Sequence, residues 1–137
     1  MIYKEEKRDL FKVPEDYFLA HCISADAHMS AGIAVEFKRR FQLSGLQKAG
    51  LGFPDCVQRG KVFNLITKQR FFHKPTPAAL AIAIGKMKEQ AEKQGVKKIA
   101  MPMIGAGLDR LPWGQNRETI KRIFQDTEIE ILVCIWK

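Results

Sequence analysis

Two short runs of small residues have the composition of phosphate-binding loops. The first is SAGIA at positions 30–34, and the second is IGAGL at positions 104–108. Small side chains let backbone N–H groups approach a phosphate closely, and a helix that starts after the loop adds a favourable dipole. Either loop alone is better explained by turn geometry. Two such loops together predict a site for a diphosphate better than for a single phosphate.

The charge balance is compatible with an anionic ligand but does not require one. The chain has 137 residues, of which 46% are hydrophobic and 28% are charged, the composition of a globular protein. Its 23 lysines and arginines exceed its 15 acidic residues and give a net charge of +8. Such an excess favours nucleic acid or a ligand that carries phosphates. A solvated basic surface with no such partner would have the same composition.

Cysteine usage and the first residues limit the class of protein. Cys22, Cys56 and Cys134 are widely spaced and form no zinc-binding pattern, so we expect reduced structural thiols, no metal and no cofactor. The first residues lack the features of a signal peptide, and no apolar run approaches the length of a membrane span. We therefore expect a soluble intracellular monomer, cytoplasmic or nuclear, in which residues 1–137 form a single domain and nothing enters a membrane.

The first small-residue loop stands between a predicted strand and a predicted helix. Residues 17–24 form a continuous apolar run that is typical of a strand covered on both faces. In the helix that follows, Ile33, Phe37 and Phe41 recur every four residues and form one apolar stripe. Residues 43–54 are predicted to be mostly loop, with one short helix.

The second half of the chain alternates between predicted strands and helices. Thr76 has the features of an N-cap followed by proline, and Gly95 is a typical helix stop. The alternation indicates a three-layer α/β/α fold with a mixed, largely parallel central sheet. The predicted elements are strands at 56–58, 62–67, 96–102 and 129–136, a helix between Thr76 and Gly95, a loop at 105–107 and a helix at 116–126.

The two loops are part of a longer series of motifs that resembles the macrodomain family. Within that family the chain is similar to the small branch of ADP-ribose protein glycohydrolases, also described as O-acyl-ADP-ribose deacylases. The motifs keep their order across nearly the whole chain, and only residues 43–61 match poorly. They are DLF at 9–11, LAHCIS at 19–24, MSAGIAV at 29–35, LITK at 65–68, HKPT at 73–76, MP at 101–102 and IGAGLDRL at 104–111.

The resemblance implies a cleft over the sheet that holds ADP-ribose. Asp9 and Leu10 would lie at the adenine end, where Asp9 accepts a hydrogen bond from the exocyclic amine, and Trp136 would contact the adenine side. Ser24 would line the cleft, and Thr67 belongs to the same set of ligand contacts. The diphosphate and distal ribose would be held by two loops, Ala31, Gly32, Ile33 and Ala34 in the first and Met103, Ile104, Gly105, Ala106, Gly107 and Leu108 in the second.

The resemblance also assigns the chemistry to two side chains. In this branch the lysine that matches Lys68 is the nucleophile, and the aspartate that matches Asp109 is the general acid and base. A neutral amine attacks the anomeric carbon of the distal ribose and forms a covalent adduct, while a carboxylate moves protons to and from the reacting groups. Without the resemblance, Lys68 would be interpreted as a solvated charge and Asp109 as a turn residue. His21, His28 and His73 are interpreted as structural or surface residues.

We therefore predict a hydrolase that removes ADP-ribose from acyl-linked targets. These targets are ADP-ribosylated glutamate or aspartate in proteins, O-acyl-ADP-ribose or, given the basic surface, ADP-ribosylated nucleic acid. A reader that binds ADP-ribose without turnover and a phosphatase acting on ADP-ribose 1″-phosphate are the alternatives. A non-enzymatic nucleic-acid module is disfavoured, because we find no aromatic stacking platform in the sequence.

Overall fold

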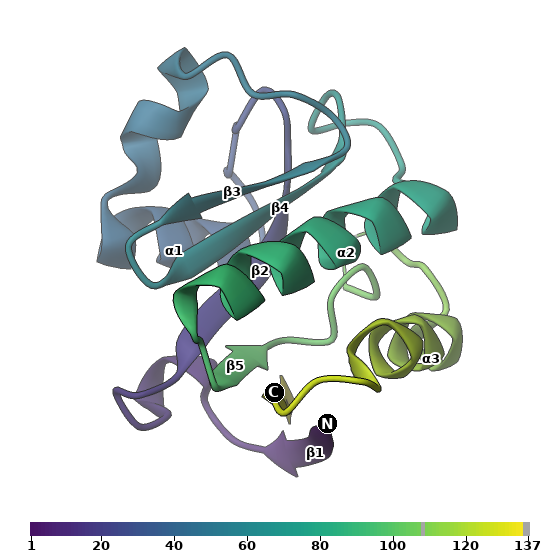
Figure 1. Cartoon of the computed structure of the whole chain (residues 1–137). Helices are drawn as coiled ribbons and strands as arrows, with labels where there is room; N and C mark the ends of the chain where they lie inside the picture. The colour runs from purple at the N-terminus through teal and green to yellow at the C-terminus, as the bar shows by residue number, and fades with distance from the viewer. Residues whose placement is uncertain (108, 136–137) are drawn as a thin grey trace.

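The fold is built on one six-stranded sheet. The computed structural model describes residues 1–107 and 109–135. Its strands lie in the order β1-β6-β5-β2-β4-β3, and each neighbouring pair is parallel except β3 and β4, which are antiparallel (Figure 1). This confirms the predicted mixed, largely parallel sheet. The strands are β1 (Ile2–Lys7), β2 (Phe18–Ser24), β3 (Asp55–Arg59), β4 (Val62–Lys68), β5 (Lys98–Met101) and β6 (Glu130–Ile135).

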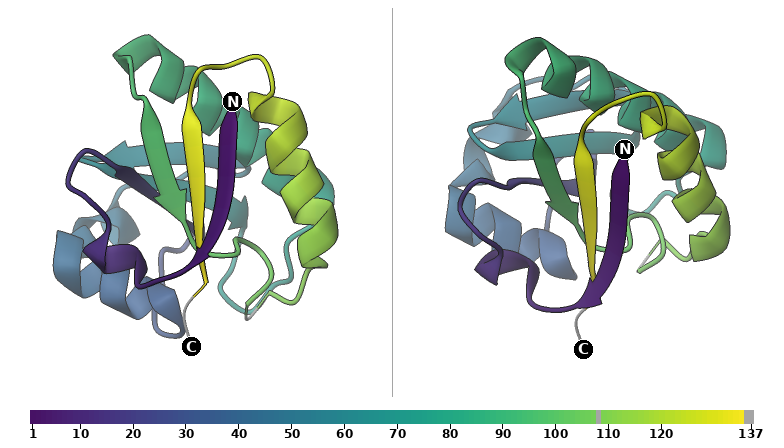
Figure 2. Two further views of the ribbon diagram at one scale, coloured as in Figure 1. Left: turned by 90° about the horizontal axis from the view of Figure 1, so that it is seen from below. Right: turned by 60° about the horizontal axis from the view of Figure 1, so that its bottom comes forward.

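Helices lie on both faces of the sheet and complete three layers (Figure 2). On one face, α2 (Pro77–Gln94) and α3 (Trp113–Phe124) pack over an apolar core. On the other face, α1 (Ile33–Phe41) and the 3₁₀ segments η1 (Leu10–Lys12) and η2 (Leu43–Lys48) enclose a second apolar core. The predicted α/β/α architecture is therefore confirmed, and the sheet separates two cores.

The ends of α2 follow from local sequence. The Thr76 side chain accepts a hydrogen bond from the backbone N–H of Ala79 at 3.1 Å, and Pro77 occupies the first turn. Both features stabilise a helix start, since they satisfy or remove backbone donors that have no partner within the helix. Gly95 ends the helix with a φ of 70°, a conformation that costs glycine little. The cap also fixes where the loop that follows β4 must end.

Strand β1 is the element that our sequence analysis did not predict. It lies at the edge of the sheet and pairs with β6 alone, and four of its six residues are exposed. On the side of α3, Arg117 donates to Glu5 through Nε at 2.5 Å. An edge strand with a charged face has no continuous apolar run, which explains why it escapes detection. Two other predictions differ at element ends: β5 spans Lys98–Met101 rather than 96–102, and α3 spans Trp113–Phe124 rather than 116–126.

The predicted apolar stripe of α1 is only partly correct. Phe37 is fully buried and stacks on the His21 ring, with ring centroids 3.9 Å apart, and Phe41 is half-buried. Ile33, in contrast, is 37% exposed, because the first turn of α1 opens onto a cleft instead of packing on the sheet. Within the described residues, no helix has both the length and the apolarity that crossing a membrane requires.

Candidate active site

A cleft of about 1060 Å³ opens where the parallel strands end. Its walls are the loops that follow β2, β4 and β5, together with residues 9–11 and the start of α1. The carboxyl edge of a parallel sheet is the usual ligand site in open α/β folds, because loops from several strands converge there. The two loops of small residues that predicted a diphosphate site both line this cleft.

The first small-residue loop requires glycine at position 32. Gly32 precedes α1 with φ 63° and ψ −152°, a backbone conformation that is essentially restricted to glycine. Ser30, Ala31 and Gly32 are all exposed in the cleft wall. The start of α1 is thus open to a ligand, and its first N–H groups have no partner within the helix. This arrangement suits an anionic group.

The second small-residue loop is held in shape by α3. Gly105 has a φ of 74°, and a Cβ at this position would lie 2.8 Å from Asn116 Nδ2. Asn116 is buried on α3 and donates through Nδ2 to the carbonyl of Ile104 at 3.0 Å. The loop closes when the N–H of Leu111 donates to the carbonyl of Gly105 at 2.8 Å. The position of Asp109 in this loop therefore depends on contacts with α3.

Lys68 and Asp109 form an ion pair inside the cleft. Lys68 is the last residue of β4, and Asp109 follows the second small-residue loop. Lys68 Nζ lies 2.7 Å from Asp109 Oδ1, and the two side chains are only 15% and 16% exposed. A partly buried pair in an open cleft can both exchange a proton and meet a ligand. The structure thus brings together two residues that stand 41 positions apart in the sequence.

A neutral thiol lies beside this pair. Burial raises the pKa of Cys22 to about 12, and the neighbouring Asp109 carboxylate acts in the same direction. Cys22 is therefore protonated at neutral pH and is a poor nucleophile. The amine of Lys68 and the carboxylate of Asp109 are then the groups in this part of the cleft that are suited to nucleophilic and acid–base chemistry.

Most of the predicted ligand contacts lie in the cleft wall. Asp9 also has a local role, since its Oδ1 accepts from the backbone N–H of Phe11 at 3.0 Å and caps η1. Thr67 is buried in β4 and does not line the cleft, because its side chain alternates away from that of Lys68. Leu108 and Trp136 lie outside the described residues. The predicted residues in the wall are Asp9, Leu10, Ser24, Ala31, Gly32, Ile33, Ala34, Lys68, Met103, Ile104, Gly105, Ala106, Gly107 and Asp109.

Two aromatic groups of the cleft escaped our sequence analysis. Phe11 lines the cleft beneath the guanidinium of Arg40, which lies 4.6 Å from its ring centroid. Phe71, Phe72 and His73, from the loop after β4, also line the cleft and are exposed. The cleft therefore has exposed rings that our sequence analysis did not identify. The run of three ring-bearing residues, two positions after the LITK motif, is the signal that could have found them.

The comparisons with known proteins agree with this geometry. The chain is 42% identical over 132 residues to the Homo sapiens protein named ADP-ribose glycohydrolase OARD1, which covers 93% of this chain and 87% of the human one. The macrodomain of Thermus aquaticus DarG superposes with a TM-score of 0.84 at 21% identity, over 97% of each chain. Thermosipho africanus DarTG, solved in complex with ADP-ribose, superposes with a TM-score of 0.79 at 17% identity, over 98% of this chain and 41% of that one. The sequence pattern of the Macro domain family matches residues 62–120, and the chain belongs to that family.

Proposed function

We propose that this protein is a hydrolase that releases ADP-ribose from acyl-linked acceptors, with Lys68 as nucleophile and Asp109 as general acid and base. The observation that carries the proposal is the 2.7 Å contact between Lys68 Nζ and Asp109 Oδ1 inside a cleft that two small-residue loops line. The name of the human relative, ADP-ribose glycohydrolase, supports the same activity. A cleft of about 1060 Å³ is also large enough for a ligand of dinucleotide size.

The ligand would run along the cleft from the N-terminal segment to the ion pair. Asp9 and Leu10 would meet the adenine, and the carboxylate of Asp9 has a second oxygen available for the exocyclic amine, since Oδ1 caps η1. The starts of α1 and of the 104–107 loop would receive the diphosphate through backbone N–H groups. The distal ribose would then lie next to Lys68 and Asp109.

In the first step, Asp109 would take a proton from Lys68 through their hydrogen bond, and the neutral amine would attack C1″ of the distal ribose. The C1″–N bond forms as the bond from C1″ to the acyl oxygen breaks, and the acceptor leaves as a carboxylate. The proton on Asp109 then passes to solvent, which balances the proton that ester hydrolysis releases.

In the second step, the Asp109 carboxylate would take a proton from a water that attacks C1″. The C1″–N bond breaks, ADP-ribose is released, and Asp109 returns the proton to the amine of Lys68. The pair is thereby restored to its starting charges, an ammonium and a carboxylate.

Substrate comparison with the wild-type protein tests this function. We expect the protein to release ADP-ribose from two substrates, a peptide ADP-ribosylated on glutamate and O-acetyl-ADP-ribose. The release is measured under single-turnover conditions by mass spectrometry. In oxygen-labelled water the label should enter ADP-ribose, because the proposed mechanism has water attack C1″, whereas a phosphatase acting on ADP-ribose 1″-phosphate would place the label in phosphate. Tight binding of ADP-ribose with no release from either acyl substrate would instead identify a reader, and labelled phosphate would identify a phosphatase.

A further inference from the structure

An exposed aromatic segment lies in the cleft wall, in the loop that follows Lys68 and β4. We call residues 71–73, Phe71, Phe72 and His73, the aromatic strap. Phe72 is 71% exposed and Phe71 is 48% exposed, and all three residues line the cleft. Large exposed apolar side chains that adjoin a cleft are typical of contact surfaces, since their exposure to water is unfavourable. The mechanism proposed above uses none of the three.

The strap is held in place by Asp26, which makes it a preformed surface. The backbone N–H of Phe71 donates to Asp26 Oδ2 at 3.0 Å. The other oxygen, Oδ1, accepts from the hydroxyl of Ser24 and from the N–H of His28. Burial alone would raise the pKa of Asp26, but these three hydrogen bonds outweigh it and hold the pKa below its usual range. The ionised carboxylate therefore ties the loop after β2 to the loop after β4.

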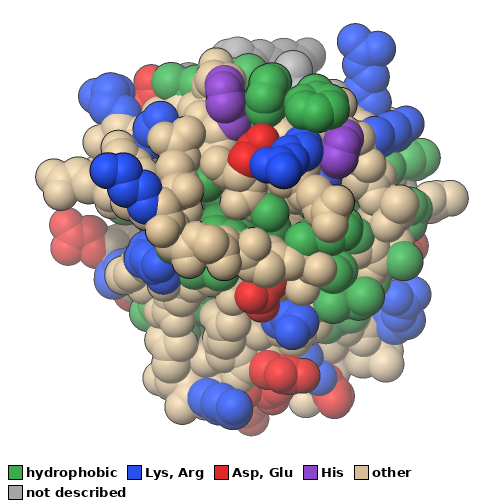
Figure 3. Space-filling model, turned by 90° about the horizontal axis from the view of Figure 1, so that it is seen from above, with side chains coloured by type: hydrophobic (Ala, Val, Ile, Leu, Met, Phe, Trp, Pro, Cys, Tyr) green, Lys and Arg blue, Asp and Glu red, His purple; other side chains and the backbone are tan. Residues whose placement is uncertain are grey.

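Ring packing fixes one phenylalanine and leaves the other free. The rings of His28 and Phe71 are stacked, with centroids 4.1 Å apart and planes 18° apart. The Phe72 ring is edge-on to Phe71 at 5.4 Å and to His73 at 4.7 Å. Phe71 is thus the anchored member, and Phe72 presents its ring to solvent. Figure 3 shows histidine side chains beside hydrophobic ones near the top of one face of the molecule.

The strap lies within reach of the position that the acceptor must take. ADP-ribose runs from adenine through the diphosphate to the distal ribose, and the acceptor is bonded to C1″ of that ribose. With adenine near Asp9 and C1″ near Lys68, the acceptor extends beyond Lys68. Phe72 follows Lys68 by four positions, so their Cα atoms are at most about 14 Å apart.

We propose that the aromatic strap binds the acceptor polypeptide next to its ADP-ribosylated carboxylate side chain. The preferred acceptor has an acidic sequence with an apolar residue beside the modified one. This rests on the function proposed above. The apolar neighbour would pack on Phe72, and the acidic residues would face Arg70 and Lys74, which flank the strap and are exposed. A nucleic acid would instead need a continuous basic path for its backbone. In Figure 3 most of the basic side chains lie at the left and right margins of this face, with one between the histidine side chains near its top, so they do not form one continuous path, and this favours the peptide.

Binding without turnover tests the proposal. In the Lys68→Ala background, titration calorimetry compares free ADP-ribose with a glutamate-ADP-ribosylated acidic peptide that carries leucine next to the modified residue. We expect Phe72→Ala to weaken peptide binding about tenfold and ADP-ribose binding less than about twofold, as for loss of an interface anchor. Replacement of the peptide's leucine by glycine should weaken peptide binding to the protein with Phe72 intact by the same factor. Ile82→Ala, which removes an exposed apolar side chain of α2 outside the cleft, is the matched control and should change neither affinity.

Three other results would overturn the acceptor role. Equal weakening of both ligands by Phe72→Ala would mean that the strap contacts ADP-ribose itself, and no weakening would mean that it contacts neither. If Phe72→Ala weakened binding only of an ADP-ribosylated single-stranded oligonucleotide, the strap would be assigned to nucleic acid. If the wild type binds the peptide in a Phe72-dependent manner but releases no ADP-ribose from it, the proposed hydrolase fails while the acceptor surface stands.

Asp26→Asn provides a second variant that leaves the rings in place. An amide has one acceptor oxygen, so it cannot accept from Ser24, His28 and Phe71 as the carboxylate does. We expect it to weaken peptide binding about threefold to tenfold, more than it weakens ADP-ribose binding. Asp55→Asn is the control of equal charge change, since Asp55 accepts from the N–H of Cys56 outside the cleft. Equal effects of the two variants would overturn the positioning role of Asp26.

Discussion

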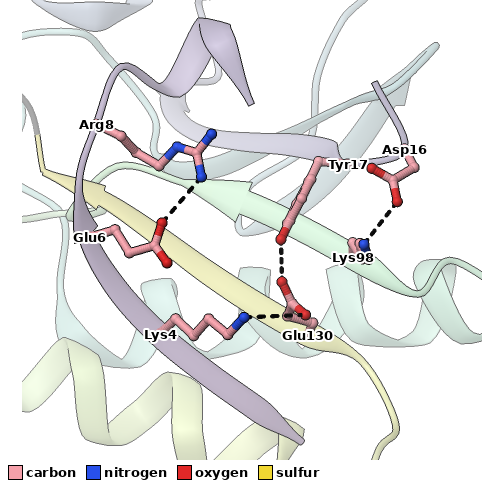
Figure 4. Close-up of polar contacts among 7 residues, drawn as sticks. All are labelled: Lys4, Glu6, Arg8, Asp16, Tyr17, Lys98 and Glu130. Carbon is pink, nitrogen blue, oxygen red and sulfur yellow. Dashed lines mark hydrogen bonds and ion pairs between the residues drawn. The ribbon is translucent and has the colours of Figure 1, made fainter. Parts of the chain in front are cut away.

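Two lysine–aspartate pairs of nearly the same length lie at opposite ends of the sheet. Lys68 and Asp109 are 2.7 Å apart at the carboxyl ends of the strands, and Lys98 and Asp16 are 2.9 Å apart where β5 begins (Figure 4). The first pair is 15% and 16% exposed, and the second is 38% and 58% exposed. The side-chain types and the distance are therefore not what distinguishes a site from a surface contact.

The surroundings of the two pairs make the difference. The Lys98–Asp16 pair stands near other polar contacts, in which Lys4 pairs with Glu130 and Tyr17 donates to the same carboxylate (Figure 4). Its hydrogen bond raises the pKa of Lys98 and lowers that of Asp16, so both stay charged at neutral pH. The Lys68–Asp109 pair faces a cleft with two loops suited to a diphosphate. A ligand that delivers C1″ to the amine is what would make this pair reactive.

Removal of the two lysines should give the largest contrast. We expect Lys68→Ala to lower kcat for release of ADP-ribose by at least about 10³-fold, because it removes the proposed nucleophile, the amine that pairs with Asp109. Lys98→Ala should leave kcat within about twofold, since an exposed pair contributes little. Steady-state assays on a glutamate-ADP-ribosylated peptide measure both. Comparable losses in the two variants would break the distinction between the pairs.

The aspartates should differ in the same way, with a somewhat smaller effect. We expect Asp109→Asn to lower kcat by about 10²- to 10⁴-fold, the usual contribution of a general acid and base. Asp16→Asn should have no measurable effect on kcat. Calorimetry with ADP-ribose serves as the control, because Asp109→Asn should retain binding. Loss of ADP-ribose binding together with activity would assign Asp109 to ligand binding rather than to proton transfer.

A pH titration probes the buried layer between the two ends of the sheet. His21 is fully buried on β2 and contacts Asn64 through Nε2 at 2.6 Å, and burial lowers its pKa to about 4. Because the unfolded chain binds a proton near pH 6.5 and the folded protein does not, stability is lost as the pH falls from about 6.5 towards 4, by about 3 kcal/mol at most. The free energy of unfolding, measured with urea at pH 7 and pH 4.5, should differ less between the two pH values for His21→Gln than for the wild type. An unchanged difference would mean that His21 does not titrate in this window.

Glycine substitutions should give the smallest effect that still separates the cleft from its surroundings. Gly105→Ala places a Cβ at a φ of 74° and 2.8 Å from Asn116 Nδ2, so we expect a loss of about 1–3 kcal/mol in the free energy of unfolding. Gly85→Ala, in α2 with no atom within 4 Å of the added Cβ, should instead add about 0.5–1 kcal/mol. If urea unfolding gave equal and small changes in the free energy of unfolding for the two variants, the second small-residue loop would tolerate a side chain at position 105.

Periodicity and local caps made most of the fold predictable. The apolar run of β2 and the Thr76 and Gly95 ends of α2 are local signals, and the structure confirms them. Strand β1 carries no such signal, because an edge strand is held by its neighbour more than by its own pattern. Ile33 was assigned to the buried stripe because periodicity does not reveal which turn of a helix opens onto a cleft.

The site was predictable in its loops but not in its pairing. Small residues identify the two phosphate-type loops from composition alone, whereas the meeting of Lys68 and Asp109 depends on the order of β4 and β5 in the sheet. The family resemblance supplied that pairing. The aromatic strap is visible in the sequence as Phe71, Phe72 and His73, but only the tie to Asp26 explains why the rings stay exposed at the cleft.

Trapping of the covalent intermediate tests the central claim most directly. Asp109→Asn protein would be mixed with a glutamate-ADP-ribosylated peptide, quenched rapidly and analysed by peptide mapping with mass spectrometry. The experiment is run at raised pH, where hydroxide in solution can take the proton of Lys68 in place of Asp109, whereas the second step still lacks its positioned base. An ADP-ribosyl adduct should then accumulate, and we predict that the adduct maps to Lys68. Release of the free peptide with no adduct at any time point, or an adduct on another residue, would contradict the assignment of Lys68 as the nucleophile.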